Sequence, residues 1–235
     1  MLMKTSKGLV EYARAQLGRP YWYGTFGNTA TADLLQMKTG QYPAHYQRAR
    51  MERYKSEIGE RVHDCVGLIK GYLWSDTPES KPVYNSAQDV SANGMLLKCK
   101  ERGRIYSLPE IPGILVFMPG HVGVYIGGGR VIEARGFNYG VVETEVRDRP
   151  WETWGKCPWI KYPTASRYFA KCDKDETSIV DALKSLGENS AYSARKVIAQ
   201  ANGIEDYAGT AKQNIKLLSL LKQGELIKPE RAYTD

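Results

Sequence analysis

The spacing of apolar residues predicts a helix close to the N-terminus. Between Leu9 and Leu17, apolar side chains recur at the interval that places them on one face of a helix. Gly18 and Pro20 then end the pattern. This stretch is therefore expected to be helical up to about Gly18.

A second helix is predicted at DCVGLIKGYLW, where an apolar run follows Asp64 and Cys65. Aspartate is a preferred N-cap residue, because its carboxylate accepts hydrogen bonds from the free N–H groups of the first turn. Asp64 is therefore expected at the N-cap and Cys65 in the first turn. The residues between the two helices, about 25–60, are polar and partly helical, which is typical of an insertion.

Short β-branched segments follow in the middle of the chain, separated by glycine or proline. The run Gly127 to Gly129 lies between two of them and predicts a hairpin turn. Helices followed by a meander of strands indicate an α+β domain, with helices packed on an antiparallel sheet. The predicted strands are GILVFM, HVGVYIG, RVIEARG and YGVVETEV, with CPWIKYP as a further candidate.

The last part of the chain has a helical pattern throughout. Thr210 and Gln213 have the spacing of a capping box. We expect a catalytic domain at 1–168, which includes the insertion, and a small all-α domain at 176–235. The three predicted helices each end at a glycine suited to the position after a helix, namely Gly187, Gly203 and Gly224.

Composition and charge describe an ordinary globular protein with a basic surface. Of 235 residues, 42% are hydrophobic and 25% are charged. The net charge of +7 favours anionic partners such as nucleic acid, acidic lipid or bacterial wall polymers. The basic residues are scattered, so we expect no nucleic-acid partner. The 16 tyrosines favour strands and aromatic contacts with a polar polymer.

Long apolar stretches are not found in the sequence. The N-terminal region is less apolar than an export signal, which needs roughly 7–15 apolar residues. No window approaches the roughly 20 apolar residues of a membrane span. We therefore expect synthesis in the cytoplasm without a signal peptide, and no membrane insertion. Free thiols are expected at the four cysteines, which form no C-x-x-C pair: Cys65, Cys99, Cys157 and Cys172.

Cys65 is the strongest candidate for chemistry. A helix N-terminus favours a thiolate, because unpaired backbone N–H groups stabilise the negative charge. The same N–H groups could stabilise the oxyanion that forms during acyl transfer. A position at the start of the second helix thus predicts a cysteine nucleophile, whereas a cysteine that only packs in the core is the plainer alternative.

A cysteine nucleophile needs a histidine as its base, and the chain has three histidines. His121 begins a predicted strand, and Glu133 lies on the next strand among apolar residues. An unpaired carboxylate is costly to bury, so Glu133 is expected to orient His121. Alternatively, Glu133 faces solvent, or His63, Cys65 and His121 bind zinc.

The motifs DCVGLI and PGILVFMPGHVGVYIGGGRVIEARG, in this order, resemble the NlpC-type cysteine peptidases of bacterial cell walls. The opening YARAQLGRPYWYG also resembles the first helix of that family. The resemblance implies a papain-like α+β fold that uses no metal or other cofactor. The implied roles are nucleophile for Cys65, base for His121, third catalytic residue for Glu133, and substrate binding for Asp64, Tyr21 and Tyr23.

The sequence departs from the family pattern at three positions. Glu133 stands where many members have histidine, which is compatible with orienting an imidazole. Val66 replaces the usual serine beside the nucleophile, and this replacement leaves substrate choice open. Ile114 replaces the aspartate of a Pro-Gly-Asp turn.

The C-terminal helices resemble segments found at the ends of endolysins from phages of Gram-positive hosts. The two resemblances imply a phage or prophage endolysin that binds peptidoglycan and anionic wall polymers and reaches the wall through a holin-type hole. It would cleave an amide bond of the stem peptide, next to D-glutamate. The alternatives are an N-acetylmuramoyl-L-alanine amidase and a catalytically silent wall-binding or phage tail protein.

Overall fold

The computed structural model describes residues 4–163 and 168–229. The chain forms two compact units, Met1–Tyr162 and Pro163–Asp235. Each unit has its own buried core. The division falls slightly before the boundary that the sequence pattern places between the catalytic domain and the helical domain.

The first unit is built on a six-stranded antiparallel sheet with the order β3-β8-β4-β5-β6-β7. A hairpin through Gly127 to Gly129 connects β5 and β6, and all three glycines have positive φ. The predicted turn is thereby confirmed. Glycine suits these three positions, because a positive φ strains residues that carry a side chain. The strands are β3 (Arg102–Arg104), β4 (Leu115–Met118), β5 (His121–Gly127), β6 (Arg130–Ala134), β7 (Val141–Glu145) and β8 (Thr153–Gly155).

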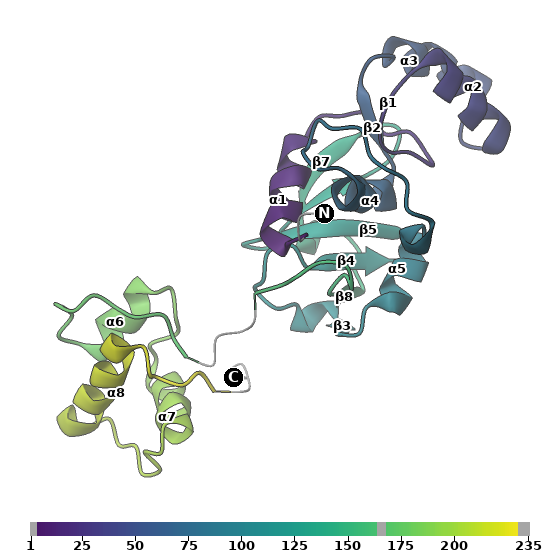
Figure 1. Cartoon of the computed structure of the whole chain (residues 1–235). Coiled ribbons are helices and arrows are strands. Elements are labelled where there is room, and N and C mark those ends of the chain that lie inside the picture. Colours follow the sequence, from purple (N-terminus) through teal and green to yellow (C-terminus); the bar gives the residue numbers. More distant parts are fainter. Residues whose placement is uncertain (1–3, 164–167, 230–235) are drawn as a thin grey trace. The chain divides into compact units, whose positions relative to one another are not determined.

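Helices α1 (Ser6–Ala15) and α4 (Cys65–Trp74) pack on one face of this sheet (Figure 1). The apolar face of α1 buries Leu9 and Ala13, as the sequence pattern predicts. Almost every residue of α4 is buried, so this helix runs through the core. The α+β class, with helices on an antiparallel sheet, is confirmed. The other helical segments of the unit after α4 are η2 (Ser86–Gln88), α5 (Ala92–Lys98), η3 (Ile105–Ser107) and η4 (Val146–Asp148).

The opposite face of the sheet carries a second apolar cluster. Tyr125 and Val131 pack there with Trp151 from beyond β7. Ile114, which replaces the family's aspartate, is fully buried in this cluster. Strands β4 to β6 are thus buried on both faces, which explains their nearly continuous apolar sequences.

The insertion folds as a small substructure of its own. Its two ends, β1 (Phe26–Thr29) and β2 (Arg61–His63), pair as an antiparallel ribbon. Figure 1 shows α2 (Ala32–Gln41) and α3 (Met51–Ser56) at the end of this ribbon, away from the six-stranded sheet. A 3₁₀ turn, η1 (Arg48–Arg50), precedes α3. The insertion buries a cluster of Trp22, Ala30, Leu35, Tyr46, Tyr54 and Val62.

The predicted strand at CPWIKYP is wrong. The strand of this region, β8, lies just before it. The hydroxyl of Tyr162 accepts a hydrogen bond from the Cys157 N–H at 2.9 Å and donates one to the Gly113 carbonyl at 3.0 Å. These bonds close the segment into a loop, which has only one isolated bridge, between Thr5 and Lys161.

The second unit is helical, as predicted. It consists of α6 (Ile179–Ser185), α7 (Tyr192–Ala201) and α8 (Ala211–Gln223) around a core of its own. Thr210 and Gln213 form the expected capping box. In the described part of the chain, no helix is both long and apolar enough to cross a membrane. Positive φ is found at all three predicted helix-ending glycines, Gly187, Gly203 and Gly224.

Candidate active site

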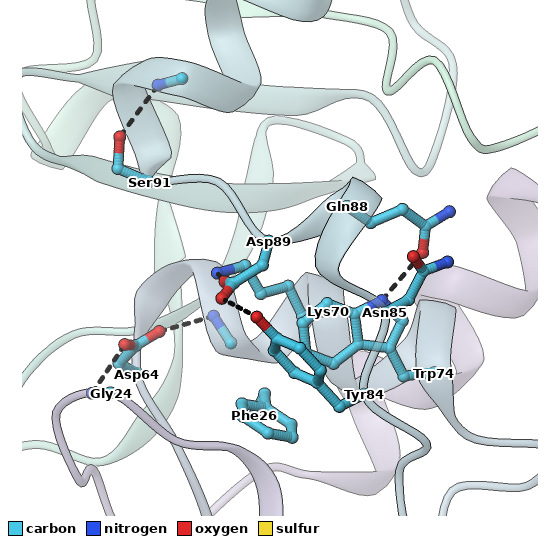
Figure 2. A network of polar contacts seen from close by, with 12 residues as sticks. Gly24, Phe26, Asp64, Lys70, Trp74, Tyr84, Asn85, Gln88, Asp89 and Ser91 are labelled. Carbon is cyan, nitrogen blue, oxygen red and sulfur yellow. Dashed lines mark hydrogen bonds and ion pairs between the residues drawn. The ribbon is translucent and has the colours of Figure 1, made fainter.

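Asp64 fixes the start of α4. It is the N-cap residue, and its Oδ1 accepts a hydrogen bond from the Gly67 N–H at 2.6 Å. Its Oδ2 accepts a second bond from the Gly24 N–H at 2.8 Å. Figure 2 shows both bonds. Asp64 thereby ties the loop before the insertion to the helix that carries Cys65.

Cys65 is the first residue of α4 and is 8% exposed. Its Sγ lies 3.9 Å from the carbonyl oxygen of Gly120, the residue that precedes His121. Burial and the nearby charge of Asp64 raise the pKa of the thiol to about 12, although the backbone N–H groups of Val66 and Val122 act in the opposite direction. The expectation that the helix N-terminus gives Cys65 a low pKa is therefore wrong, because burial outweighs it.

His121 and Glu133 are brought together by adjacent strands. His121 opens β5 and Glu133 lies in β6, and the His121 Nε2 is 2.7 Å from the Glu133 Oε2. Glu133 is completely buried, so it does not face solvent. An ionised carboxylate can only accept, which places the ring hydrogen on Nε2 and leaves Nδ1 free to accept a proton. The pair thus has the tautomer that a general base needs.

Two further residues hold Glu133. Arg149 donates to both carboxylate oxygens, from Nε at 2.9 Å and from Nη2 at 3.0 Å. Thr144 donates from its hydroxyl at 2.8 Å. Burial acts to raise the pKa of Glu133, but the bonds from His121, Arg149 and Thr144 together outweigh it and lower the pKa to about 2. Glu133 is therefore a fixed negative charge at neutral pH.

The sequence pattern missed both Arg149 and Thr144. Thr144 pairs with Val131 in the β6–β7 ladder, so a correct strand register could have placed it near Glu133. Arg149 follows the 3₁₀ turn after β7 and returns to the sheet only through tertiary folding. No local pattern indicates its partner.

Trp151 covers the imidazole of His121. The two rings are stacked, with centroids 5.6 Å apart and an interplanar angle of 16°. The space for the indole exists because Gly123 has no side chain. A Cβ at Gly123 would lie 3.0 Å from the Trp151 ring and 2.5 Å from a methyl group of Val131. This explains why a glycine interrupts the apolar strand HVGVYIG.

A cavity of about 400 Å³ lies at the start of α4 and is lined by Asp64 and Val66, the sequence neighbours of Cys65, and by Gly67. Tyr23 lines the same cavity, and its ring stacks on His45 of the insertion at 3.6 Å between centroids. The candidate substrate-binding residues Asp64 and Tyr23 therefore both border this space. The replacement of serine by Val66 makes one part of its wall apolar.

Tyr21 lies close to the nucleophile. It forms a parallel bridge with His63. Burial, followed by the proximity of Cys65 and Asp64, raises the pKa of its hydroxyl. Tyr21 is thus a neutral hydrogen-bonding group beside the thiol at physiological pH.

His63 belongs to the core and does not flank the site. It is completely buried, and its Nε2 lies 3.0 Å from the hydroxyl of Tyr12. Burial, together with the charges of Arg61 and Arg19, lowers the pKa of His63 to about 3. The proposed zinc site finds no support, since no three His, Cys, Asp or Glu side chains within 4–163 and 168–229 form a group that could hold a metal ion.

Comparisons with known proteins were made at the level of sequence and of structure. No protein-family model matches the sequence, and no curated protein matches it. Solved structures of NlpC and P60 proteins are similar to about two thirds of the chain. NlpC1 from Trichomonas vaginalis is 17% identical with a TM-score of 0.37, over 64% of this chain and 45% of that one. The chain therefore spans under half of that protein.

Two mycobacterial structures are similar at the same level. The peptidoglycan hydrolase RipB from Mycobacterium tuberculosis is 19% identical, with a TM-score of 0.38 over 67% of each chain. The P60 domain of antigen MAP1204 from M. avium subspecies paratuberculosis is 20% identical, with a TM-score of 0.39 over 67% of this chain and 98% of that one. Since these TM-scores are below 0.5, the function proposed for this chain rests on the residues of the site.

Proposed function

We propose that the chain is a cysteine peptidase that hydrolyses an amide bond in the stem peptide of peptidoglycan. The observation that carries the proposal is the 2.7 Å contact between His121, at the start of β5, and Glu133. The Cys65 thiol lies against the carbonyl of Gly120, the residue directly before His121. Nucleophile, base and orienting carboxylate thus come from one helix start and two neighbouring strands.

The raised pKa of Cys65 determines how the reaction begins. Since the free thiol is protonated at neutral pH, His121 takes the proton through Nδ1 as the sulfur attacks the substrate carbonyl. The new S–C bond converts the carbonyl into an oxyanion, which the N–H groups at the start of α4 stabilise. Glu133 remains ionised and stabilises the imidazolium through Nε2.

The second half of the reaction regenerates the enzyme. The imidazolium donates its proton to the leaving amine as the C–N bond breaks, which leaves a thioester on Cys65. His121 then accepts a proton from water, and the resulting hydroxide attacks the thioester. The substrate acid leaves, and the thiol regains the proton from His121.

The finer assignment rests on the sequence resemblance. We propose cleavage next to D-glutamate by a phage or prophage endolysin, with the second unit binding the wall of a Gram-positive host after release through a holin-type hole. The basic net charge of the chain supports an anionic wall partner. Amidase activity and a silent wall-binding role are the competing functions, and the following experiment distinguishes them.

The test compares wall digestion by wild type, Cys65→Ala and Cys99→Ala. Cys99 is a matched control, because it is also a buried free thiol but packs against α5, where its Sγ contacts the Met95 carbonyl. We expect wild type and Cys99→Ala to release fragments with new stem-peptide termini, and Cys65→Ala to release none. Free muramic lactyl groups would instead establish an amidase, and equal clearing by Cys65→Ala would reject the cysteine mechanism.

A further inference from the structure

The insertion forms one wall of the cavity at the start of α4. Lys38, Gln41 and Tyr42 line it from α2 of the insertion and its end. The opposite wall comes from the start of α4 and from the segment that leads into α5. The insertion therefore contributes side chains to a cavity that also borders the start of α4, the helix that carries the proposed nucleophile.

Most charged groups of this cavity already have partners. Lys70 donates to the Oδ1 of Asp89 at 2.5 Å, and the hydroxyl of Tyr84 donates to the Oδ2 of the same residue at 2.9 Å. Asp64 accepts bonds from two backbone N–H groups. Figure 2 shows Asp89 between Lys70 and Tyr84, and Asp64 at the helix start.

Lys38 is the exception among these charged groups. It is only 9% exposed, yet its Nζ donates to one neutral acceptor, the Gln41 Oε1 at 3.1 Å. Its Nζ also lies 5.5 Å from the centre of the Tyr42 ring. An ammonium group has three N–H donors, so the single bond to Gln41 leaves donors for a further hydrogen-bond acceptor. No carboxylate of the described residues lies within ion-pair distance of Lys38. A buried cation with free donors favours an anionic ligand.

The position of Lys38 is built into the insertion. Lys38 and Leu35 are the two buried residues of α2 and lie on the same face of that helix. Leu35 packs in the apolar cluster of the insertion, which anchors the helix. Since Gln41 accepts from Lys38 through Oε1, its amide N–H groups remain available for the same ligand.

We propose that Lys38, assisted by Gln41, binds a carboxylate of the substrate peptide and so makes the insertion a specificity element. This inference rests on the proposed peptidase function. A glutamyl residue that is linked through its γ-carboxyl group keeps a free α-carboxylate. Amidation of this α-carboxylate removes its negative charge and leaves the length of the peptide unchanged. The ligand is therefore a carboxylate close to the scissile bond, and the amidated peptide is its matched control.

The test measures kcat/KM for two synthetic stem peptides that differ only in this carboxylate or carboxamide. A hydrogen-bonded charge pair contributes about 1.5–3 kcal/mol, so wild type should prefer the carboxylate by roughly tenfold to a hundredfold. Lys38→Met should lose this preference because its kcat/KM falls more on the carboxylate peptide than on the carboxamide peptide. Lys38→Arg should restore part of the preference.

Lys55→Met is the control, because Lys55 lies on α3 of the same insertion, is exposed and pairs with Glu52. It should keep the wild-type preference. Equal cleavage of both peptides by wild type, or an unchanged preference in Lys38→Met, would overturn the inference. If wild type cleaves neither peptide, and Cys65→Ala digests cell walls to the same extent as wild type, the proposed function itself fails.

Discussion

The Nε2 of His121 lies 2.7 Å from the Oε2 of Glu133, across neighbouring strands of the antiparallel sheet. The contact is diagonal in the ladder, since Val124 pairs with Ile132 and the register places Gly123 opposite Glu133. His121 stacks on Trp151 of the second apolar cluster, whereas Cys65 belongs to the cluster under α4 and contacts the start of β5 at the Gly120 carbonyl. The pair therefore depends on strand register as well as on residue identity.

Acid should weaken the fold through Glu133. Its pKa is about 2 in the folded protein and 4.5 ordinarily, so the unfolded chain takes up a proton first as the pH falls. The stabilisation is complete above about pH 5 and is lost between roughly pH 4.5 and 2, amounting to roughly 3 kcal/mol. Urea unfolding at several pH values should show this loss in wild type and a smaller one in Glu133→Gln. Identical pH dependence in both proteins would contradict the assigned role.

Arg149 should act as a positioning residue through Glu133. Replacing it by methionine removes two hydrogen bonds and raises the pKa of Glu133 from its low value. We expect kcat to fall roughly tenfold or more, because the imidazole is less firmly oriented. The acidic limb of the pH–rate profile should also move to higher pH.

Arg147→Met is the control for this effect. Arg147 is exposed and pairs with Glu145 at 2.6 Å, away from Glu133. Its variant should keep the wild-type pH profile. If Arg149→Met also keeps that profile, Arg149 only stabilises the fold.

Gly123 should tolerate no side chain. An added Cβ meets Val131 at 2.5 Å and Trp151 at 3.0 Å, so the indole that stacks on His121 must shift. Gly123→Ala should lose about 1–3 kcal/mol of stability, as overpacked cores do, and should also lose activity. Gly40→Ala has open space around its Cβ and lies in α2, so it should be neutral or slightly stabilising. Thermal unfolding and kcat measured together provide the comparison, and equal behaviour of the two variants would count against the packing argument.

Cys65 should react slowly with alkylating reagents at neutral pH. Its pKa of about 12 leaves very little thiolate at pH 7. The alkylation rate, followed by peptide mass mapping, should rise steadily from pH 7 to 10. Fast alkylation that is already maximal near pH 6 would instead indicate a preformed thiolate and would contradict the proton transfer assigned to His121.

Local sequence patterns predicted the parts of the fold that depend on neighbouring residues. Asp64 as an N-cap, the hairpin at Gly127 to Gly129 and the glycine-terminated C-terminal helices follow from backbone chemistry within a few residues. The short strands β1, β2, β3 and β8 were missed. Each has only three or four residues, so it shows no usable alternation.

The candidate site likewise contains residues that local sequence patterns indicate and residues that only tertiary folding brings there. Cys65, His121 and Glu133 could be selected from the sequence because each begins or occupies a recognisable element. Arg149 and Trp151 could not, because they reach the site only through the return of the chain after β7. The raised pKa of Cys65 was also missed, since burial depends on how α4 packs against the sheet.

The central claim is that the Cys65 sulfur attacks the substrate carbonyl. Intact-protein mass spectrometry of a stem-peptide digestion, quenched rapidly in acid, tests it most directly. The account predicts a thioester adduct equal in mass to the acyl fragment, mapped to Cys65 and absent in Cys65→Ala. Release of product at the wild-type rate by Cys65→Ala, with no adduct on the wild-type protein, would contradict it.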